Sequence, residues 1–327
     1  MTVLIAHLLV GLGLFFVGVS LVGRNMKKLA TRRVRLLIAR FTSNDIKSAL
    51  VGTLTGFVAQ TPTVAAFIVA SLLASGAVTL RRALPVILFA NAGTAMLVLI
   101  VVLDIQLAEA VAIFVAGLCY AFDIPKNRSH LVRAVLGIAL LFYGLTLFQS
   151  GAKPLADLPQ VTSLLGSVHA PLLALLVGAL LTFICQSSVA IVLLAITLTE
   201  AGVFGLDQTI MVIYGANLGS SVTTYLLSSG IKGTAKQLIM AQVLYNILGI
   251  LLFLPLFYAE FLEGIPLVKA LVTSMSSEMD EQLSWVMILF NVATPFVLVL
   301  LAAPFTSLLQ RLWPPTEEER LSAPKFL

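Results

Sequence analysis

The stretch LLALLVGALLTFICQSSVAIVLLAITLTEAG, residues 172–202, decides the fold. It consists of two apolar segments, Leu172 to Gln186 and Val189 to Gly202, which meet at the polar residues Ser187 and Ser188. Each segment falls short of the roughly 20 residues that a helix needs to cross the hydrocarbon core of a bilayer. Two short apolar segments joined by a polar break predict a re-entrant hairpin, because irregular backbone at membrane depth must be buried in protein or line a cavity.

The same layout occurs earlier in the chain, at Ile46 to Gln60 and Val64 to Gly76, around the break Thr61-Pro62-Thr63. A shift of 126 residues aligns the two halves of the sequence without a gap. The identical pairs include Gly11 and Gly137, Gly18 and Gly144, Lys27 and Lys153, Gly52 and Gly178, Phe57 and Phe183, Gln60 and Gln186, Gly76 and Gly202, Leu80 and Leu206, Asn91 and Asn217, and Gly93 and Gly219. A match at one fixed spacing that includes glycines and polar residues predicts an internal duplication.

The composition is that of a membrane protein. Hydrophobic residues make up 59% of the 327 residues and charged residues only 11%, with a mean hydropathy of +1.05, whereas soluble proteins carry about 25% charged residues. The formal net charge of +5 does not indicate a nucleic-acid-binding protein, because the basic residues lie in connections between apolar runs. We therefore expect one membrane domain over residues 1–327, with the lipid bilayer and not nucleic acid as its partner.

Other apolar segments are long enough for complete crossings, although 106–121 is at the lower limit. They are 3–22, 83–103, 106–121, 131–150, 209–228, 237–257 and 284–309. We expect an all-α integral membrane protein in which repeat one covers about 5–121 and repeat two about 131–247. An extra helix at about 284–309 and a short cytoplasmic tail at 311–327 follow the repeats.

The number of crossings predicts how the repeats are oriented. One helix, a hairpin and two further helices precede the second repeat, so it enters the membrane in the opposite sense, which makes the two repeats inverted. Of the 20 Lys and Arg residues, all except Lys153 and Lys269 then lie on one side, which the positive-inside rule assigns to the cytoplasm. The N-terminus is expected outside and the C-terminus in the cytoplasm, in the cell (inner) membrane. The basic run from Arg24 to Lys47 is interpreted as a flank against anionic headgroups.

Neutral polar residues cluster where the apolar segments are interrupted. Besides the two hairpin tips, these are Asn91 to Thr94 and Gly215 to Ser221, which predict discontinuous helices at 83–103 and 209–228. Hydroxyls, amides and unwound carbonyls can replace the water around a hard monovalent cation, and half-helix N-termini attract an anion. The alternative is that these Ser, Thr, Asn and Gly residues only hold helices together. Their recurrence in both repeats favours a binding role.

The second repeat carries the most specific pattern. Its Gln186-Ser187-Ser188 hairpin, followed by Gly-Ala-Asn-Leu-Gly-Ser-Ser-Val-Thr-Thr at 215–224, resembles the type II sodium/phosphate cotransporter family, whose hallmark is QSSS in both repeats. The resemblance extends from about Leu8 to Phe305 and includes 242–246 and 289–291. It implies a secondary transporter, not an enzyme, that couples symport of inorganic phosphate to sodium.

The resemblance also implies which residues form the site. The positions matched to the sodium site are Gln186, Ser187, Ser188, Ser220 and Thr223. The positions expected around the phosphate are Gln60, Thr61, Thr63, Asn91, Thr94, Gln186, Ser187, Ser188 and Asn217. Na⁺ is the implied coupling ion, and no other cofactor is expected.

The chain departs from the family pattern at several positions. Gln60-Thr-Pro-Thr63 replaces QSSS in repeat one, Val189 replaces the third Ser in repeat two, and Gln242 and Met287 stand where the family often has histidine. Transport of another small oxyanion or an organic anion therefore stays open, as does a non-transporting membrane scaffold or regulator with the same fold. A membrane enzyme and a primary pump are disfavoured, because the sequence has no intramembrane acid/base pair and no GxxxxGK[ST] loop.

Overall fold

The computed structural model describes residues 2–42, 44–74, 76, 78–101, 106–156, 171–317 and 319. Within these residues the regular structure is helical throughout. Six helices there are long and apolar enough to cross a membrane, at Thr2–Met26, Leu80–Leu99, Ser129–Pro154, Leu206–Leu227, Gly233–Glu263 and Met279–Leu300. The structure is that of an all-α protein with several membrane-spanning helices.

Most of the long helices lie where the sequence predicts them. The predictions are confirmed, with shifted ends, for α4 (Leu80–Val101), α6 (Ser129–Ala156), α10 (Leu206–Leu227) and α11 (Gly233–Glu263). Helix α5 (Gln106–Ala121) has its predicted bounds. Its 16 residues measure only about 24 Å at 1.5 Å per residue, so α5 is shorter than the hydrocarbon core that it was expected to cross.

The predicted end of the first helix at residue 22 is wrong. Helix α1 (Thr2–Phe41) continues for 40 residues through the basic run that was expected to be a connection. The reason is local, because no Gly or Pro follows Gly23 within the helix and Lys, Arg and Leu are good helix formers. The basic residues after Arg24 therefore belong to a helical extension of the apolar part of α1.

The predicted helix at 284–309 is also wrong, because the structure divides it at Leu301 into α13 (Met279–Leu300) and α14 (Ala302–Leu312). Pro304 explains the division, since proline has no N–H to donate to the carbonyl of Leu300 and its ring clashes with that carbonyl.

The expected tail lies outside the described residues from 320 onward. Before that point, the Glu319 carboxylate accepts hydrogen bonds from the N–H and hydroxyl of Thr234, at 3.2 and 2.7 Å.

Both expected pairs of short helices are present. They are α2 (Asp45–Ala59) with α3 (Pro62–Ala74), and α8 (Pro171–Cys185) with α9 (Ser188–Glu200). Gln60 ends α2 and Gln186 follows α8, and both have positive φ values, 55° and 54°. A residue in the left-handed region ends a helix sharply, so the two pairs turn in the same way at corresponding residues.

The expectation that α4 and α10 are discontinuous is wrong, since both helices run without a break. The glycines in and beside them instead allow close contact between helix backbones. A Cβ on Gly56 of α2 would lie 1.8 Å from the Ala90 carbonyl oxygen of α4. A Cβ on Gly215 of α10 would lie 1.9 Å from the carbonyl oxygen of Leu175 in α8. Glycine is therefore required where each hairpin packs against its long helix.

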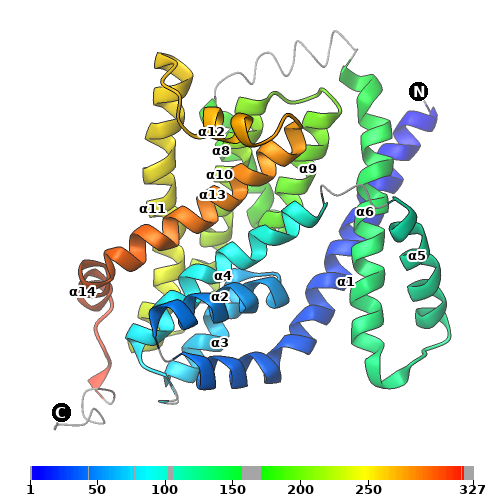
Figure 1. Cartoon of the computed structure of the whole chain (residues 1–327). Coiled ribbons are helices and arrows are strands. Elements are labelled where there is room, and N and C mark those ends of the chain that lie inside the picture. The colour runs from blue at the N-terminus through cyan, green and yellow to red at the C-terminus, as the bar shows by residue number, and fades with distance from the viewer. Residues whose placement is uncertain are drawn as a thin grey trace.

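Helices α1 and α6 pack through a third set of glycines, and they lie side by side in Figure 1. A Cβ on Gly11 would lie 2.8 Å from the carbonyl oxygen of Gly144, and one on Gly18 would lie 2.6 Å from that of Gly137. Residue numbers rise along α1 as they fall along α6, so the two helices are antiparallel. Helix α5 packs against α6 at this end of the molecule.

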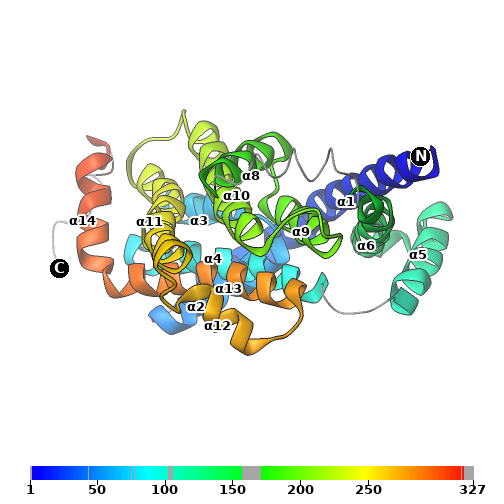
Figure 2. The same ribbon diagram turned by 90° about the horizontal axis from the view of Figure 1, so that it is seen from above.

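Helices α11 and α13 connect the two hairpin units. Helix α11 packs against α3, α4 and α10, and α13 packs against α4, α9 and α10. Seen from above, α14 lies at one end of the molecule and α5 at the other (Figure 2). Tyr214 of α10, Phe253 of α11 and Phe290 of α13 pack with ring centroids 5.2 to 5.8 Å apart. This aromatic cluster is buried and lies where the three helices meet.

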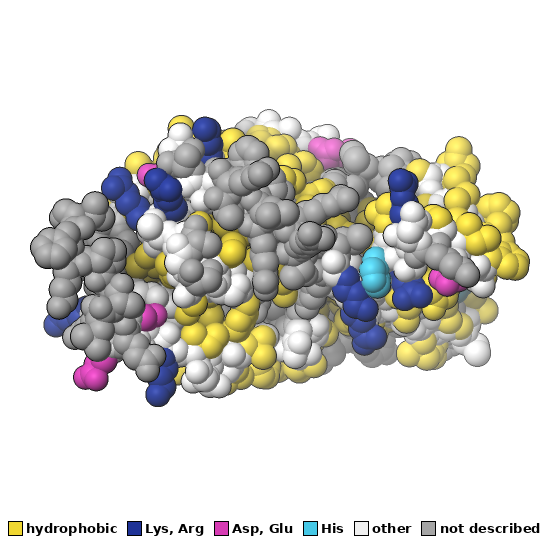
Figure 3. Space-filling view, turned by 90° about the horizontal axis from the view of Figure 1, so that it is seen from below, with side chains coloured by type: hydrophobic (Ala, Val, Ile, Leu, Met, Phe, Trp, Pro, Cys, Tyr) yellow, Lys and Arg dark blue, Asp and Glu magenta, His cyan; other side chains and the backbone are white. Residues whose placement is uncertain are grey.

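The face seen from below carries many Lys and Arg side chains and fewer acidic ones (Figure 3). It corresponds to the lower side of Figure 1, where α4 and α6 begin. The sequence analysis expects such an excess of Lys and Arg on the cytoplasmic side.

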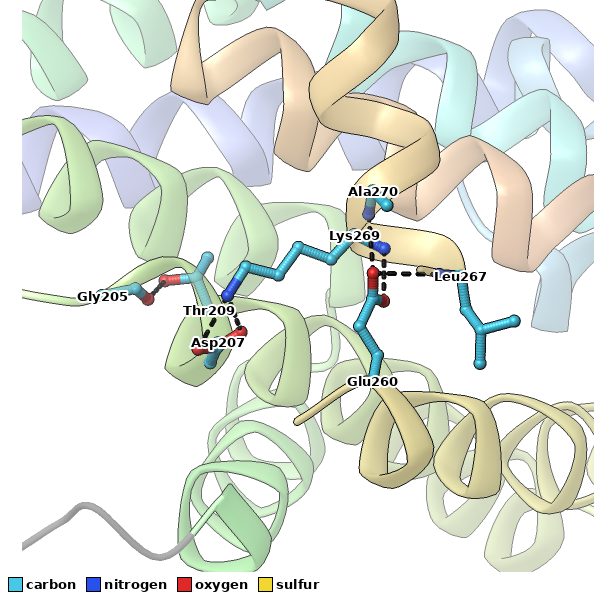
Figure 4. Close-up of polar contacts among 7 residues, drawn as sticks. All are labelled: Gly205, Asp207, Thr209, Glu260, Leu267, Lys269 and Ala270. Atoms are coloured by element: carbon cyan, nitrogen blue, oxygen red, sulfur yellow. Dashed lines mark hydrogen bonds and ion pairs between the residues drawn. The ribbon is translucent and has the colours of Figure 1, made fainter. Parts of the chain in front are cut away.

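Helix α12 (Val268–Met275) between α11 and α13 was not predicted. The Glu260 carboxylate accepts hydrogen bonds from the backbone N–H groups of Leu267, Lys269 and Ala270, at 3.1, 2.6 and 2.7 Å (Figure 4). An acidic side chain at the first N–H groups of a helix satisfies donors that have no partner within it. The Lys269 ammonium also pairs with Asp207 at 2.8 Å, so this short helix connects the end of α11 to the start of α10.

The glycine contacts predict a specific loss of stability. Gly56→Ala should lower the melting temperature in detergent, because overpacking of a close helix contact costs about 1–3 kcal/mol or more and exceeds the roughly 1 kcal/mol gained in helix propensity. Gly13→Ala is the control, since a Cβ there meets no atom within 4 Å. Its melting temperature should be equal to or above that of the parent. Equal melting temperatures for Gly56→Ala and the parent would contradict the backbone contact.

Candidate functional site

The two hairpin tips line a single cavity of about 390 Å³. Gln60 and Thr61 come from the first tip, and Gln186 and Ser187 come from the second. These pairs are 126 residues apart in the sequence, yet they face the same space. Four of the residues expected to bind phosphate, two of which were also expected to bind sodium, are thus brought together.

Each tip holds its glutamine in a strained backbone conformation. The left-handed region costs a residue other than glycine roughly 1–2 kcal/mol, and Gln60 and Gln186 both adopt it. The Gln60 amide donates to the carbonyl of Phe57. Glycine is the usual residue at such a helix end, so two glutamines at equivalent strained positions point to a function for their side chains.

The second tip also places a helix N-terminus at the cavity. Ser187 caps α9, and its hydroxyl oxygen accepts from the Ala190 N–H at 3.3 Å. Val189 and Ala190 in the first turn line the cavity as well. The N-terminal N–H groups of a helix carry a partial positive charge and favour an anion. Pro62 and Ser188 are the first residues of α3 and α9, and both are buried.

Helix α1 forms another wall of the cavity. The polar residues that it contributes are Ser20 and Arg24, one turn apart, and Gly23 lies between them. The remaining wall is largely apolar and is formed by Phe16, Val19, Val22, Leu97, Leu141 and Cys185. Arg24 is the charged residue of this lining, although the sequence analysis assigned it to the headgroup flank. Nothing in its sequence context distinguishes it from the neighbouring basic residues.

Other expected site residues lie outside the cavity lining. The Thr63 hydroxyl pairs with that of Thr224 at 2.7 Å and so connects α3 to α10. Thr224 in turn donates to the carbonyl of Ser220 at 2.8 Å. Thr223 donates to the carbonyl of Gly219 at 3.3 Å. These hydroxyls extend the polar groups from the first tip along α10.

Asn91 of α4 is buried and exchanges two hydrogen bonds with Gln242 of α11. Each amide nitrogen donates to the other amide oxygen, at 2.9 and 2.8 Å. Thr94 donates to the Asn91 carbonyl at 2.8 Å. Because the amides satisfy each other, this pair holds α4 against α11 and does not face the cavity.

Asn217, which corresponds to Asn91 in the second repeat, has different partners. Its amide donates to the carbonyl of Ile213 at 2.8 Å and contacts the Met287 sulfur at 3.6 Å. Nearby, Asn246 donates to the hydroxyls of Ser220 and Ser221 at 3.1 and 2.8 Å. Asn246 Oδ1 is buried and has no hydrogen-bond partner in the part of the chain that the structure describes.

The polar groups of these sites are amides and hydroxyls. Among the described residues, no group of three or more His, Cys, Asp or Glu side chains lies together to hold a metal ion. The cavity instead combines neutral donors and acceptors with one guanidinium group and a helix N-terminus, which suits a small oxyanion.

The Na⁺/Pi-cotransporter family model matches residues 14–150 and again residues 149–257. The chain belongs to the Na⁺/Pi-cotransporter family. The two matches to the Na⁺/Pi-cotransporter model together include both hairpin tips and the long helices α4 and α10. Membership confirms the resemblance that the hairpin motif of the second repeat indicated.

Several curated proteins are similar to the chain over most of its length. It is 26% identical over 299 residues to "Uncharacterized protein YqeW" of Bacillus subtilis, across 91% of this chain and 93% of that protein. It is 26% identical over 306 residues to the putative inorganic phosphate export protein YjbB of Salmonella typhimurium, across 93% of this chain. The chain spans 54% of the length of that YjbB.

A relative in cattle is similar over a shorter region. The sodium-dependent phosphate transport protein 2B of Bos taurus is 27% identical over 178 residues, across 47% of this chain and 25% of that protein. No solved structure matches the chain.

The cavity can be tested by filling it. Gly23 lines it, and a Cβ at Gly23 meets no atom within 4 Å, so Gly23→Leu should occupy the space and raise helix stability by about 1 kcal/mol. Cys185 lines the same cavity. In a Cys119→Ala background, Gly23→Leu should therefore slow the modification of Cys185 by a bulky thiol reagent.

The matched control is Gly13→Leu, at another open glycine of α1 that is not part of the cavity lining. Modification of Cys185 should proceed at the parental rate in this variant. Equal rates in all three proteins would show that the space beside Gly23 is not the space that Cys185 faces.

Proposed function

We propose that the chain is a secondary transporter that carries inorganic phosphate across the cell membrane in symport with sodium. Membership of the Na⁺/Pi-cotransporter family supports the proposal, as do the names of the relatives that concern phosphate export and sodium-dependent phosphate transport. The observation that carries it is the cavity between the two tips, where Gln60, Thr61, Gln186 and Ser187 meet.

The chemistry of the cavity supports a small anion as the substrate. The side-chain amides of Gln60 and Gln186 and the hydroxyls of Thr61 and Ser187 can donate hydrogen bonds to phosphate oxygens. Their own oxygens can replace water around Na⁺. Bound sodium ions would offset the charge of the anion, and each elementary charge moved across 100 mV corresponds to about 2.3 kcal/mol.

A fuller sodium site extends from the second tip along α10. We assign Gln186, Ser187 and Ser188 to it, together with Ser220 and Thr223. The buried Oδ1 of Asn246 has no hydrogen-bond partner among the described residues, and the amide nitrogen of the same side chain donates to Ser220, which supports a cation near this part of α10. Thr63, Asn91, Thr94 and Asn217 belong to the surrounding polar framework in this proposal.

The proposed architecture is a pair of inverted repeats with re-entrant hairpins. The antiparallel packing of α1 against α6 supports it, because corresponding helices of inverted repeats run in opposite directions. The contact of Gly11 with Gly144 and that of Gly18 with Gly137 exchange under the shift of 126 residues. This is the relation that a two-fold axis between the repeats produces. It also requires α5 to cross the membrane, in a locally thinned bilayer because the helix is short.

The proposed conformation faces the cytoplasm. Arg24 lines the cavity and lies near the basic end of the apolar span Thr2–Met26. The positive-inside rule assigns this end to the cytoplasm and places the N-terminus outside. A cavity that reaches this level is accessible from the cytoplasmic side.

A non-transporting scaffold is the other function to be tested. The Gln-Thr-Pro-Thr sequence of the first tip favours it, because it departs from the family motif. However, Pro62 is the first residue of α3, a position where the missing N–H has no partner within a helix in any case. The departure at Pro62 therefore leaves Gln60 and Thr61 in place at the cavity.

Sodium coupling can be measured in proteoliposomes. Phosphate uptake should require an inward sodium gradient and should fall to the level of empty liposomes when choline replaces sodium without a proton gradient. An outward sodium gradient should drive phosphate out of loaded liposomes. This experiment tests export, which is the direction given in the name of YjbB. Equal accumulation in sodium and choline would contradict sodium symport, and no transport of any oxyanion would favour the scaffold.

Gln186→Gly separates the role of the side chain from stability. Glycine relieves the left-handed strain, so the free energy of unfolding should rise by roughly 1 kcal/mol. The melting temperature of the variant should therefore be equal to or above that of the parent. Loss of hydrogen bonds to a charged ligand, each contributing about 1.5–3 kcal/mol, should weaken phosphate transport at least about tenfold. Initial uptake rates and melting curves measure the two effects.

Asp123→Gly is the matched control for this substitution. Asp123 also has a positive φ, of 52°, but it lies in the exposed turn after α5. It should gain stability in the same way and keep parental transport. A Gln186→Gly protein with parental transport would remove Gln186 from the site.

A further inference from the structure

Arg24 occupies an unusual place for a residue of a basic membrane flank. It lies on the same face of α1 as Ser20, four residues earlier, and both line the cavity with Gln60 and Gln186. The side chain is exposed, so an anion in solution can reach it. Arg24 thus lines the same cavity as the two hairpin tips, near the end of the apolar span Thr2–Met26.

Among the described residues, no acidic side chain pairs with Arg24. No Asp or Glu belongs to the lining of the cavity. Within the described ranges, the ion pair that the structure contains joins Lys269 to Asp207 at the start of α10. A cation that no described carboxylate pairs with, in the lining of a cavity with neutral donors, is complementary to a small anion.

The second repeat does not supply an equivalent charge. The residue that corresponds to Arg24 is Ser150 of α6, whose hydroxyl lies 3.2 Å from Nδ1 of His7. The residue that corresponds to Ser20 is Thr146, which donates to the carbonyl of Phe142 at 3.3 Å. Arg24 thus gives the α1 wall of the cavity a charge that the corresponding position of α6 lacks.

We propose that Arg24 is the residue that captures a phosphate-type anion at the cavity and helps to hold it beside the two tips. The planar guanidinium group can donate two parallel hydrogen bonds to two oxygens of such an anion. This inference rests on the proposed function, since it assumes that phosphate enters this cavity. It makes Arg24 a determinant of affinity and of the preference for anions over neutral solutes.

The test is phosphate binding in the presence of sodium, measured by isothermal titration with the purified full chain in neutral detergent. Arg24→Gln should raise the dissociation constant at least about tenfold, because a hydrogen bond to a charged group is lost. Arg24→Lys should have a smaller effect, since it keeps the charge and loses the paired geometry. Arg128→Gln is the matched control, because Arg128 is exposed and is absent from the cavity lining.

Ionic strength provides a second readout that a purely structural role would not change. Added choline chloride at constant sodium should weaken phosphate binding by the parent more than by Arg24→Gln, because salt screens an exposed charge. Melting curves in the same detergent should be equal for the parent and both variants. Arg24→Lys that binds nearly as well as the parent would support the role of the charge.

The outcomes separate this inference from the proposed function. If the parent does not bind phosphate in sodium, the proposed function fails, and the inference fails with it. If the parent binds and Arg24→Gln binds equally well, the inference alone is overturned. The source of the phosphate is tested with vesicles that contain anionic phospholipid, with neutral phosphatidylcholine vesicles as the reference. If the substitution of Arg24 changes only the binding of the protein to the anionic vesicles, Arg24 contacts lipid phosphate, and the inference is overturned.

Discussion

The close contact of helix backbones at glycine is the constraint on which the rest of the structure depends. Gly56 of α2 touches the Ala90 carbonyl, and Gly215 of α10 touches the Leu175 carbonyl, at distances that a Cβ would not allow. These contacts fix each short first helix of a hairpin against a continuous long helix. The ends of the short helices, and with them the glutamines of the tips, are therefore held in place by close contact between helix backbones.

The site combines this fixed framework with groups that differ between the two halves. The tips are nearly equivalent, since Gln60 and Gln186 share their backbone conformation. The surroundings are not equivalent, because Asn91 pairs with Gln242 whereas Asn217 contacts Met287. In the proposed function, the unequal halves would give the substrate and the coupling ion different surroundings. The two halves are thus alike at the tips that line the cavity and differ in the polar framework around them.

Much of this architecture could be predicted from the sequence, because the duplication and the length of apolar segments act over many residues. The hairpins and their glutamines were predicted in this way. The breaks in α4 and α10 were predicted wrongly, since a Gly-rich polar stretch is compatible both with an interrupted helix and with close packing. The place of Arg24 in the cavity lining was not predicted, because it depends on what lies opposite α1. The separation of α13 from α14 depends on Pro304, a single residue within an apolar run.

The unbroken course of α1 has a mechanical consequence. Its 40 residues measure roughly 60 Å, about twice the hydrocarbon thickness. Near its start, α1 is joined to α6 at Gly11 and Gly18, and near its other end Ile38 is buried among residues of the first hairpin, α4 and α11. Helix α1 is therefore held near both ends, while its middle, with Ser20, Gly23 and Arg24, forms a wall of the cavity. Any displacement of α6 or of the first hairpin would consequently change the position of that wall.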